Sequence, residues 1–178
     1  MNQNINWGII GLGNIALQFA QAFRDSQNGK LKAISSKNPD KIKLFSDKFN
    51  VKKKYCFIEY ENLLNCEDID IVYIALPNSM HTEWIKKSIS NKKNILVEKP
   101  AFINLLEVEE IQNQIIDSDL FFTEGFMYRY TPLILKVIEI LKNEIIGEPK
   151  SMTSNFGVNL LTKKNMFGII KNKKIDKE

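Results

Sequence analysis

A glycine-rich turn at residues 11–16, with the sequence GLGNIA, constrains the fold of this chain more than any other feature. It directly follows a short apolar run at residues 6–10. It also opens residues 14–25, where apolar side chains recur at the spacing of one helix face. A strand, a tight turn and a helix in immediate succession form the first half of a βαβ unit, so the turn predicts a parallel sheet.

Each residue of the turn suits the binding of a phosphate group. Gly11 allows the tight turn, and Gly13 lets the backbone approach a pyrophosphate without a Cβ in the way. Ala16 permits close packing of the helix on the strand. The helix begins at Asn14 and Ile15, where unpaired N–H groups and the positive end of the helix dipole face a ligand. The turn therefore favours dinucleotide binding, and the alternative is a glycine turn that is only structural.

Strand-like and helix-like segments alternate along most of the chain. We expect strands at residues 6–10, 31–35, 54–58, 69–76, 94–97 and 120–124, and helices at residues 14–25, 39–49, 80–91, 105–116 and from Pro132 onward. This alternation predicts the α/β class, with a doubly wound parallel sheet of the Rossmann type.

The expected sheet divides the chain into two parts. Residues 1–126 form the nucleotide-binding domain, which accounts for all six expected strands. Residues 127–178 form the start of an α+β C-terminal domain, with a first strand expected at residues 152–160. We expect the rest of that second domain to be missing, so that the chain is truncated.

The residues after the second expected strand indicate which dinucleotide is bound. An Asp or Glu at this place would accept a hydrogen bond from the adenosine 2′-hydroxyl and repel a 2′-phosphate. This chain has two hydroxyls and a cation instead, Ser35, Ser36 and Lys37. The sequence therefore favours NADP over NAD, and the alternative is a surface loop that is simply polar.

Polar residues also follow the later strands, at the edge of the sheet where ligands of doubly wound folds bind. Pro77, Asn78 and His81 come after the fourth strand. His81 is the only histidine of the chain, and a lone histidine is as readily a structural residue as a ligand contact. After the fifth strand come Glu98 and Lys99, and the lysine can donate a hydrogen bond or a proton to a substrate oxygen.

With these motifs in place, the chain resembles the glucose–fructose oxidoreductase / inositol dehydrogenase (Gfo/Idh/MocA) family. The resemblance covers residues 5 to about 160 and rests on four motifs in the right order: GLGNIA, ALPNSMH, VEKP and EGFMYRYTP. The last motif and the SSK loop resemble most closely the NADP-linked dihydrodiol dehydrogenase and D-xylose dehydrogenase branch.

The resemblance implies hydride transfer between NADP, or NAD, and a sugar, cyclic polyol or diol. It implies that Lys99 is the catalytic residue, which binds the reacting hydroxyl or carbonyl group. The residues that it places at the cofactor are Gly11, Gly13, Asn14, Ile15, Ala16, Ser36, Lys37, Pro77, Asn78, His81, Glu98 and Arg129. A homo-oligomer formed through the C-terminal sheet is expected where that sheet is complete.

Composition excludes several other kinds of protein. The net charge of +4 comes from dispersed lysines, which is typical of a solvated surface and not of a nucleic-acid site. Cys56 and Cys66 form no CxxC pair, so we expect reduced thiols, no metal site and a cytoplasmic protein without a membrane span. Two alternatives to an enzyme stay open: a non-catalytic dinucleotide-binding sensor or partner subunit, and a decayed gene product.

Overall fold

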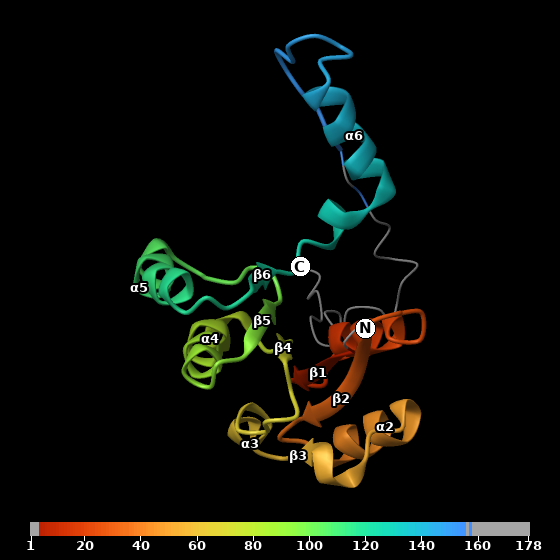
Figure 1. The fold of residues 1–178 in the computed structure, drawn as a ribbon, viewed down its shortest axis with the longest axis vertical. Coiled ribbons are helices and arrows are strands. Elements are labelled where there is room, and N and C mark those ends of the chain that lie inside the picture. Colours follow the sequence, from red (N-terminus) through yellow and green to blue (C-terminus); the bar gives the residue numbers. More distant parts are fainter. Residues whose placement is uncertain (1–3, 156, 158–178) are drawn as a thin grey trace, which may run out of the picture. The chain divides into compact units, whose positions relative to one another are not determined.

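Six parallel strands form one sheet in the order β3-β2-β1-β4-β5-β6 (Figure 1). The strands are β1 (Ile5–Ile10), β2 (Gly29–Ser35), β3 (Cys56–Phe57), β4 (Ile71–Ile74), β5 (Asn94–Val97) and β6 (Phe122–Glu124). The chain starts in the middle of the sheet, runs outward to β3, and then returns to β4 and runs outward the other way. This reversal of direction is the Rossmann order, so the predicted fold class is confirmed.

The computed structural model describes residues 4–155 and 157. The chain forms two compact units, Met1–Phe126 and Met127–Glu178, and the sheet belongs to the first. The helices of the first unit are α1 (Asn14–Ala22), α2 (Pro39–Phe49), α3 (Tyr60–Leu64), α4 (His81–Ser90) and α5 (Leu105–Asp117). Figure 1 shows α1 and α2 on one face of the sheet, and α3, α4 and α5 on the other.

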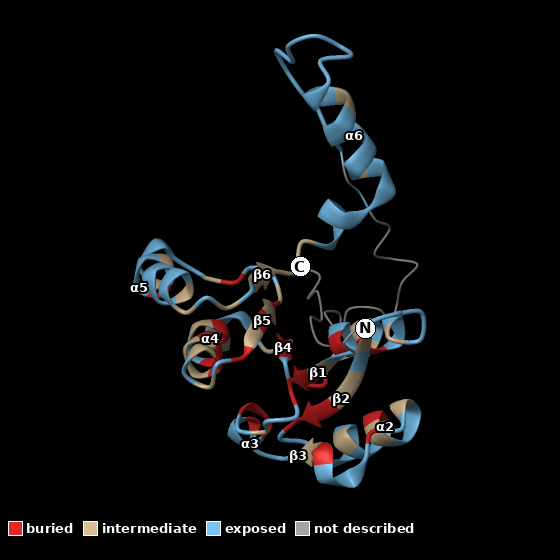
Figure 2. Cartoon of the chain, in the orientation of Figure 1, coloured by how far each residue is buried: buried red, intermediate tan, exposed pale blue. Residues whose placement is uncertain are grey.

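The central strands carry the core, because they are covered on both faces. All four residues of β4 are buried, and Figure 2 shows the buried residues gathered along β1, β2 and β4. On the α1 face, Phe19 packs on Tyr73 with the ring centroids 4.2 Å apart. On the other face, Tyr60 of α3 meets Trp84 of α4 edge to face at 5.0 Å. An aromatic contact therefore joins α1 to the sheet on one face, and another joins α3 to α4 on the other face.

Two predictions about the local structure were wrong. The third strand was expected at residues 54–58, but the structure has a 3₁₀ turn at Lys53–Tyr55 followed by a strand of two residues, Cys56–Phe57. This strand lies at the sheet edge and pairs only with β2, so little holds it extended. No helix was expected at Tyr60–Leu64, where the structure has α3.

The second unit has a 3₁₀ turn, η3 (Met127–Tyr130), and a helix, α6 (Pro132–Lys142), in its described part. Thr131 caps α6 by accepting a hydrogen bond from the backbone N–H of Ile134, and Pro132 occupies the first turn. The expected strand at 152–160 is not present at residues 152–155, and positions 156 and 158–160 lie outside the described residues. Within residues 4–155, no helix has the length and apolar character that a membrane crossing needs.

Candidate nucleotide-binding site

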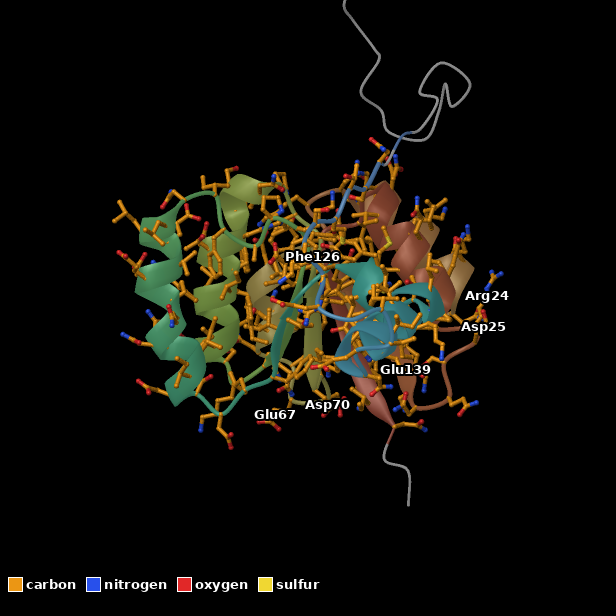
Figure 3. All side chains as sticks on the ribbon, turned by 90° about the horizontal axis from the view of Figure 1, so that it is seen from above. Arg24, Asp25, Glu67, Asp70, Phe126 and Glu139 are labelled. Atoms are coloured by element: carbon orange, nitrogen blue, oxygen red, sulfur yellow. The ribbon has the colours of Figure 1, made fainter. Side chains whose placement is uncertain are left out.

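The strand ends of the first unit are aligned, and this alignment creates the site. Ile10 pairs with Ser35 on one side and with Ile74 on the other. Ile74 pairs with Val97, and Val97 pairs with Glu124. The residues that follow these five positions therefore gather at the edge formed by the carboxyl ends of the strands. Figure 3 shows Phe126, which follows β6, far from Glu67 and Asp70, which precede β4 at the opposite edge.

Gly11 and Gly13 differ in what a side chain would meet. Gly11 has a φ of +90°, and an added Cβ would lie 2.6 Å from the carbonyl oxygen of Ala75. At Gly13 an added Cβ would meet no atom of the described chain within 4 Å. Gly11 is therefore required by the fold, whereas the space above Gly13 is open to solvent or to a ligand.

The start of α1 suits an anionic ligand. Gly13 is the N-cap residue in an extended conformation, no side chain of the described residues caps the helix, and its first turn contains no acidic residue. Asn14 and Ile15 are exposed, whereas Ala16 is fully buried against the sheet. The N–H groups of the first turn and the positive end of the helix therefore face open space beside Gly13, which fits the pyrophosphate of a dinucleotide.

At the end of β2, the two serines are less accessible than the sequence suggested. Ser35 is fully buried, and Ser36 is 5% exposed. The Ser36 Oγ accepts a hydrogen bond of 3.2 Å from the backbone N–H of Asn38, which ties the hydroxyl into the turn before α2. Lys37 is exposed and forms an ion pair with Glu59, which was not among the site residues predicted from the sequence. Lys37 is thus the exposed cation expected beside the adenosine ribose.

At the end of β4, Pro77 and Asn78 are exposed, but His81 is fully buried. Its Nδ1 lies 2.8 Å from the carbonyl oxygen of Pro100, and its Nε2 lies 2.9 Å from that of Leu76. This differs from the expectation that His81 lines the cofactor groove, because both ring nitrogens are engaged inside the protein. His81 instead joins the loop after β4 to the loop after β5.

At the end of β5, Glu98 is half-buried and Lys99 is exposed. The phenol of Tyr73, on β4, donates a hydrogen bond to the Glu98 Oε1. Burial, and then this bond to a carboxylate, raise the pKa of Tyr73, so the phenol stays protonated and remains a donor. The hydrogen bond from Tyr73 thus orients the Glu98 carboxylate. Lys99 is the next residue, beyond the carboxyl end of β5.

Glu124, the last residue of β6, holds the loop that follows β5. Its Oε1 accepts a hydrogen bond of 2.9 Å from the backbone N–H of Ala101, two residues after Lys99. The positioning role of Tyr73 was not predicted from the sequence, although the single hydroxyl in the nearly all-apolar run of residues 69–76 was a visible signal. Arg129 lies in η3 of the second unit, so its expected contact with the cofactor stays a prediction.

A protein-family comparison matches the part of the chain that forms this sheet. The model of the GFO_IDH_MocA oxidoreductase family, an NAD-binding Rossmann fold, matches residues 5–126, which is more than half of the chain. The chain belongs to this family. Membership in the Gfo/Idh/MocA family confirms the NAD-binding Rossmann domain that the glycine turn predicted.

Curated relatives of this Gfo/Idh/MocA chain are oxidoreductases. "Oxidoreductase P35" of Formosa agariphila is 33% identical over 148 residues, which are 83% of this chain and 46% of the relative. Trans-1,2-dihydrobenzene-1,2-diol dehydrogenase of Xenopus tropicalis is 30% identical over 156 residues, 86% of this chain and 47% of the relative. The chain thus spans less than half the length of these relatives.

Solved structures show the same fold. Apo scyllo-inositol dehydrogenase from Lactobacillus casei superposes with a TM-score of 0.76 at 26% identity, covering 83% of this chain and 44% of the other. A 3-ketoreductase from Actinomadura kijaniata, solved with TDP-benzene and NADP, has a TM-score of 0.72 at 30% identity, covering 82% and 46%. The matched region of this Gfo/Idh/MocA chain is therefore its dinucleotide-binding part.

Proposed function

We propose that this chain is the cofactor-binding part of an oxidoreductase that transfers a hydride between NADP and a sugar, cyclic polyol or diol. The single observation that carries the proposal is the open space at Gly13, where a Cβ would meet nothing within 4 Å, beside an uncapped helix start. The relatives named for a diol and an inositol support the substrate class. A small hydroxylated substrate is thus the proposed partner.

Each residue at the sheet edge has a proposed task. The turn at Gly11 and Gly13 holds the pyrophosphate, and Lys37 contacts the adenosine ribose or its 2′-phosphate. Glu98, oriented by Tyr73, accepts a hydrogen bond from the nicotinamide ribose. The bound nicotinamide supplies the hydride exchange.

The chemical step at the substrate is assigned to Lys99. In the direction of reduction, its ammonium donates a hydrogen bond and then a proton to the carbonyl oxygen while the hydride reaches the carbon. In the direction of oxidation, its amine accepts the hydroxyl proton while the hydride leaves the carbon. Lys99 is exposed at the end of β5, and the adjacent loop is fixed by the contacts of Pro100 with His81 and of Ala101 with Glu124. A lysine on an anchored loop suits a group that must meet a small substrate in a defined position.

The test is the Lys99→Ala variant, assayed with NADP and a panel that contains a trans-dihydrodiol, D-xylose and scyllo-inositol. Because the chain spans less than half of its relatives, turnover is measured on the longest form of the protein that contains it. We expect kcat to fall about 10²- to 10⁴-fold, the usual contribution of general acid–base catalysis, with NADPH affinity nearly unchanged.

Lys43→Ala is the matched control, because it removes the same charge from an exposed position on α2. It should leave kcat unchanged. Full activity of Lys99→Ala would refute the assignment of Lys99. Tight nucleotide binding without turnover of any substrate by the unmodified protein would instead favour a non-catalytic sensor or partner subunit.

A further inference from the structure

Glu59 lies beside Lys37, the lysine that is expected to contact the adenosine ribose. Glu59 follows β3 and precedes α3, and its Oε2 accepts a hydrogen bond from the Lys37 Nζ. Both side chains are about half exposed, at 55% for Lys37 and 52% for Glu59. The pair therefore lies at the surface, where a ligand can reach it.

The side-chain oxygens of the two polar residues that flank Lys37 accept hydrogen bonds within the turn. The Ser36 Oγ accepts a hydrogen bond from the N–H of Asn38, and Ser36 donates its own N–H to the carbonyl oxygen of Phe57 at 3.1 Å. The Asn38 Oδ1 caps α2 by accepting hydrogen bonds from the N–H groups of Asp40 and Lys41. Lys37 and its partner Glu59 are thus the charged pair beside this turn, and charge is what distinguishes a 2′-phosphate from a 2′-hydroxyl.

The ion pair also favours the charged form of Lys37. The hydrogen bond to Glu59 holds the pKa of Lys37 above its usual value, so the ammonium is charged at any physiological pH. A 2′-phosphate, which carries close to two negative charges, must compete with the Glu59 carboxylate for this ammonium. A 2′-hydroxyl brings no charge and can donate a hydrogen bond to a carboxylate.

We propose that Glu59 is a specificity-determining residue that opposes Lys37 and limits the preference of the chain for NADP over NAD. The inference rests on the proposed function, because it takes the end of β2 as the adenosine subsite. Lys37 attracts the 2′-phosphate, while Glu59 weakens that attraction and offers an acceptor to the 2′-hydroxyl of NAD. The two side chains together set the ratio of the two affinities.

The experiment titrates the 178-residue chain with NADPH and, separately, with NADH, following nucleotide fluorescence. Glu59→Gln keeps the size of the side chain and removes its charge. We expect this variant to bind NADPH about two- to fivefold more tightly, given the modest strength of exposed charge pairs, and to bind NADH equally or slightly less tightly. The gain for NADPH should shrink as salt is raised, because the charges are exposed.

Glu61→Gln is the matched control. It removes the same charge two residues away, but the Glu61 Oε1 pairs with the Lys87 Nζ at 2.7 Å. Its ratio of NADPH to NADH affinity should equal that of the unmodified chain. An unchanged ratio in Glu59→Gln, or an equal change in both variants, would overturn the proposal. Failure of the unmodified chain to bind either nucleotide would instead refute the proposed function, and this inference with it.

Discussion

The buried imidazole of His81 should contribute strongly to the stability of the first unit. Replacement by Ala removes the ring nitrogens that lie against the carbonyl oxygens of Leu76 and Pro100, so at least one of these oxygens loses its donor. It also leaves the space of a fully buried ring empty. A buried polar group left without a partner costs about 1–3 kcal/mol. Leu76 is half-buried and Pro100 is exposed, so water can replace part of what is lost. We therefore expect His81→Ala to lower the free energy of unfolding by about 2–4 kcal/mol, a large share of a typical domain's stability.

Urea unfolding followed by circular dichroism measures this difference, with the slope of the transition compared between variants. Ser90→Ala is the control, because it removes an exposed hydrogen bond from the Ser90 Oγ to the carbonyl oxygen of Lys86 on the same helix. Its free energy of unfolding should stay within about 0.5 kcal/mol of the unmodified chain. A loss below about 1 kcal/mol for His81→Ala would refute the view that this side chain holds the two loops together.

Two further predictions concern the turn and acid stability. Gly11→Ala should lower the free energy of unfolding by about 2–4 kcal/mol in the same urea assay, because its Cβ would meet the Ala75 carbonyl oxygen and its φ is positive; an unchanged midpoint would contradict this. A backbone hydrogen bond from Ile103, and then one from the Thr82 hydroxyl, lower the pKa of Glu107 below its ordinary value of 4.5. Its contribution to stability is therefore present above pH 4.5 and lost as the pH falls through the lowered value. Glu107→Gln should thus be less stable than the unmodified chain at pH 7, with the difference shrinking in acid; a difference independent of pH would argue against it.

The sequence was sufficient to predict most of the sheet, because strands alternate with helical segments along the chain and the central strand β4 is one continuous buried run. The fifth strand was predicted at residues 94–97 and is found there. The short elements at and after the outermost strand, β3, were harder to predict from the sequence. Tyr60, Leu63 and Leu64 follow the spacing of one helix face, but five residues are too few for that spacing to stand out from chance.

The glycine turn could be recognised from the sequence because its residues are adjacent in the chain. The partners of the individual side chains could not, because they come from distant segments. His81 bonds to the carbonyl oxygen of Pro100, 19 residues away, and Lys37 pairs with Glu59, 22 residues away. Whether a polar residue at the carboxyl end of a strand faces a ligand or the protein interior depends on such contacts. The sequence therefore predicted the location of the site better than the role of each residue in it.

The central claim is that a dinucleotide binds at the glycine turn, and Gly13 tests it most directly. At Gly13 an added Cβ would meet nothing within 4 Å among the described residues, and φ is −91°, so Gly13→Ala should fold as well as the unmodified chain. The measurement is a fluorescence titration of both chains with NADPH, alongside their urea midpoints. The account predicts saturable binding by the unmodified chain, and binding about 10- to 100-fold weaker in Gly13→Ala at an equal midpoint, since an added methyl would crowd the pyrophosphate. No binding by the unmodified chain, or equal binding by both, would contradict it.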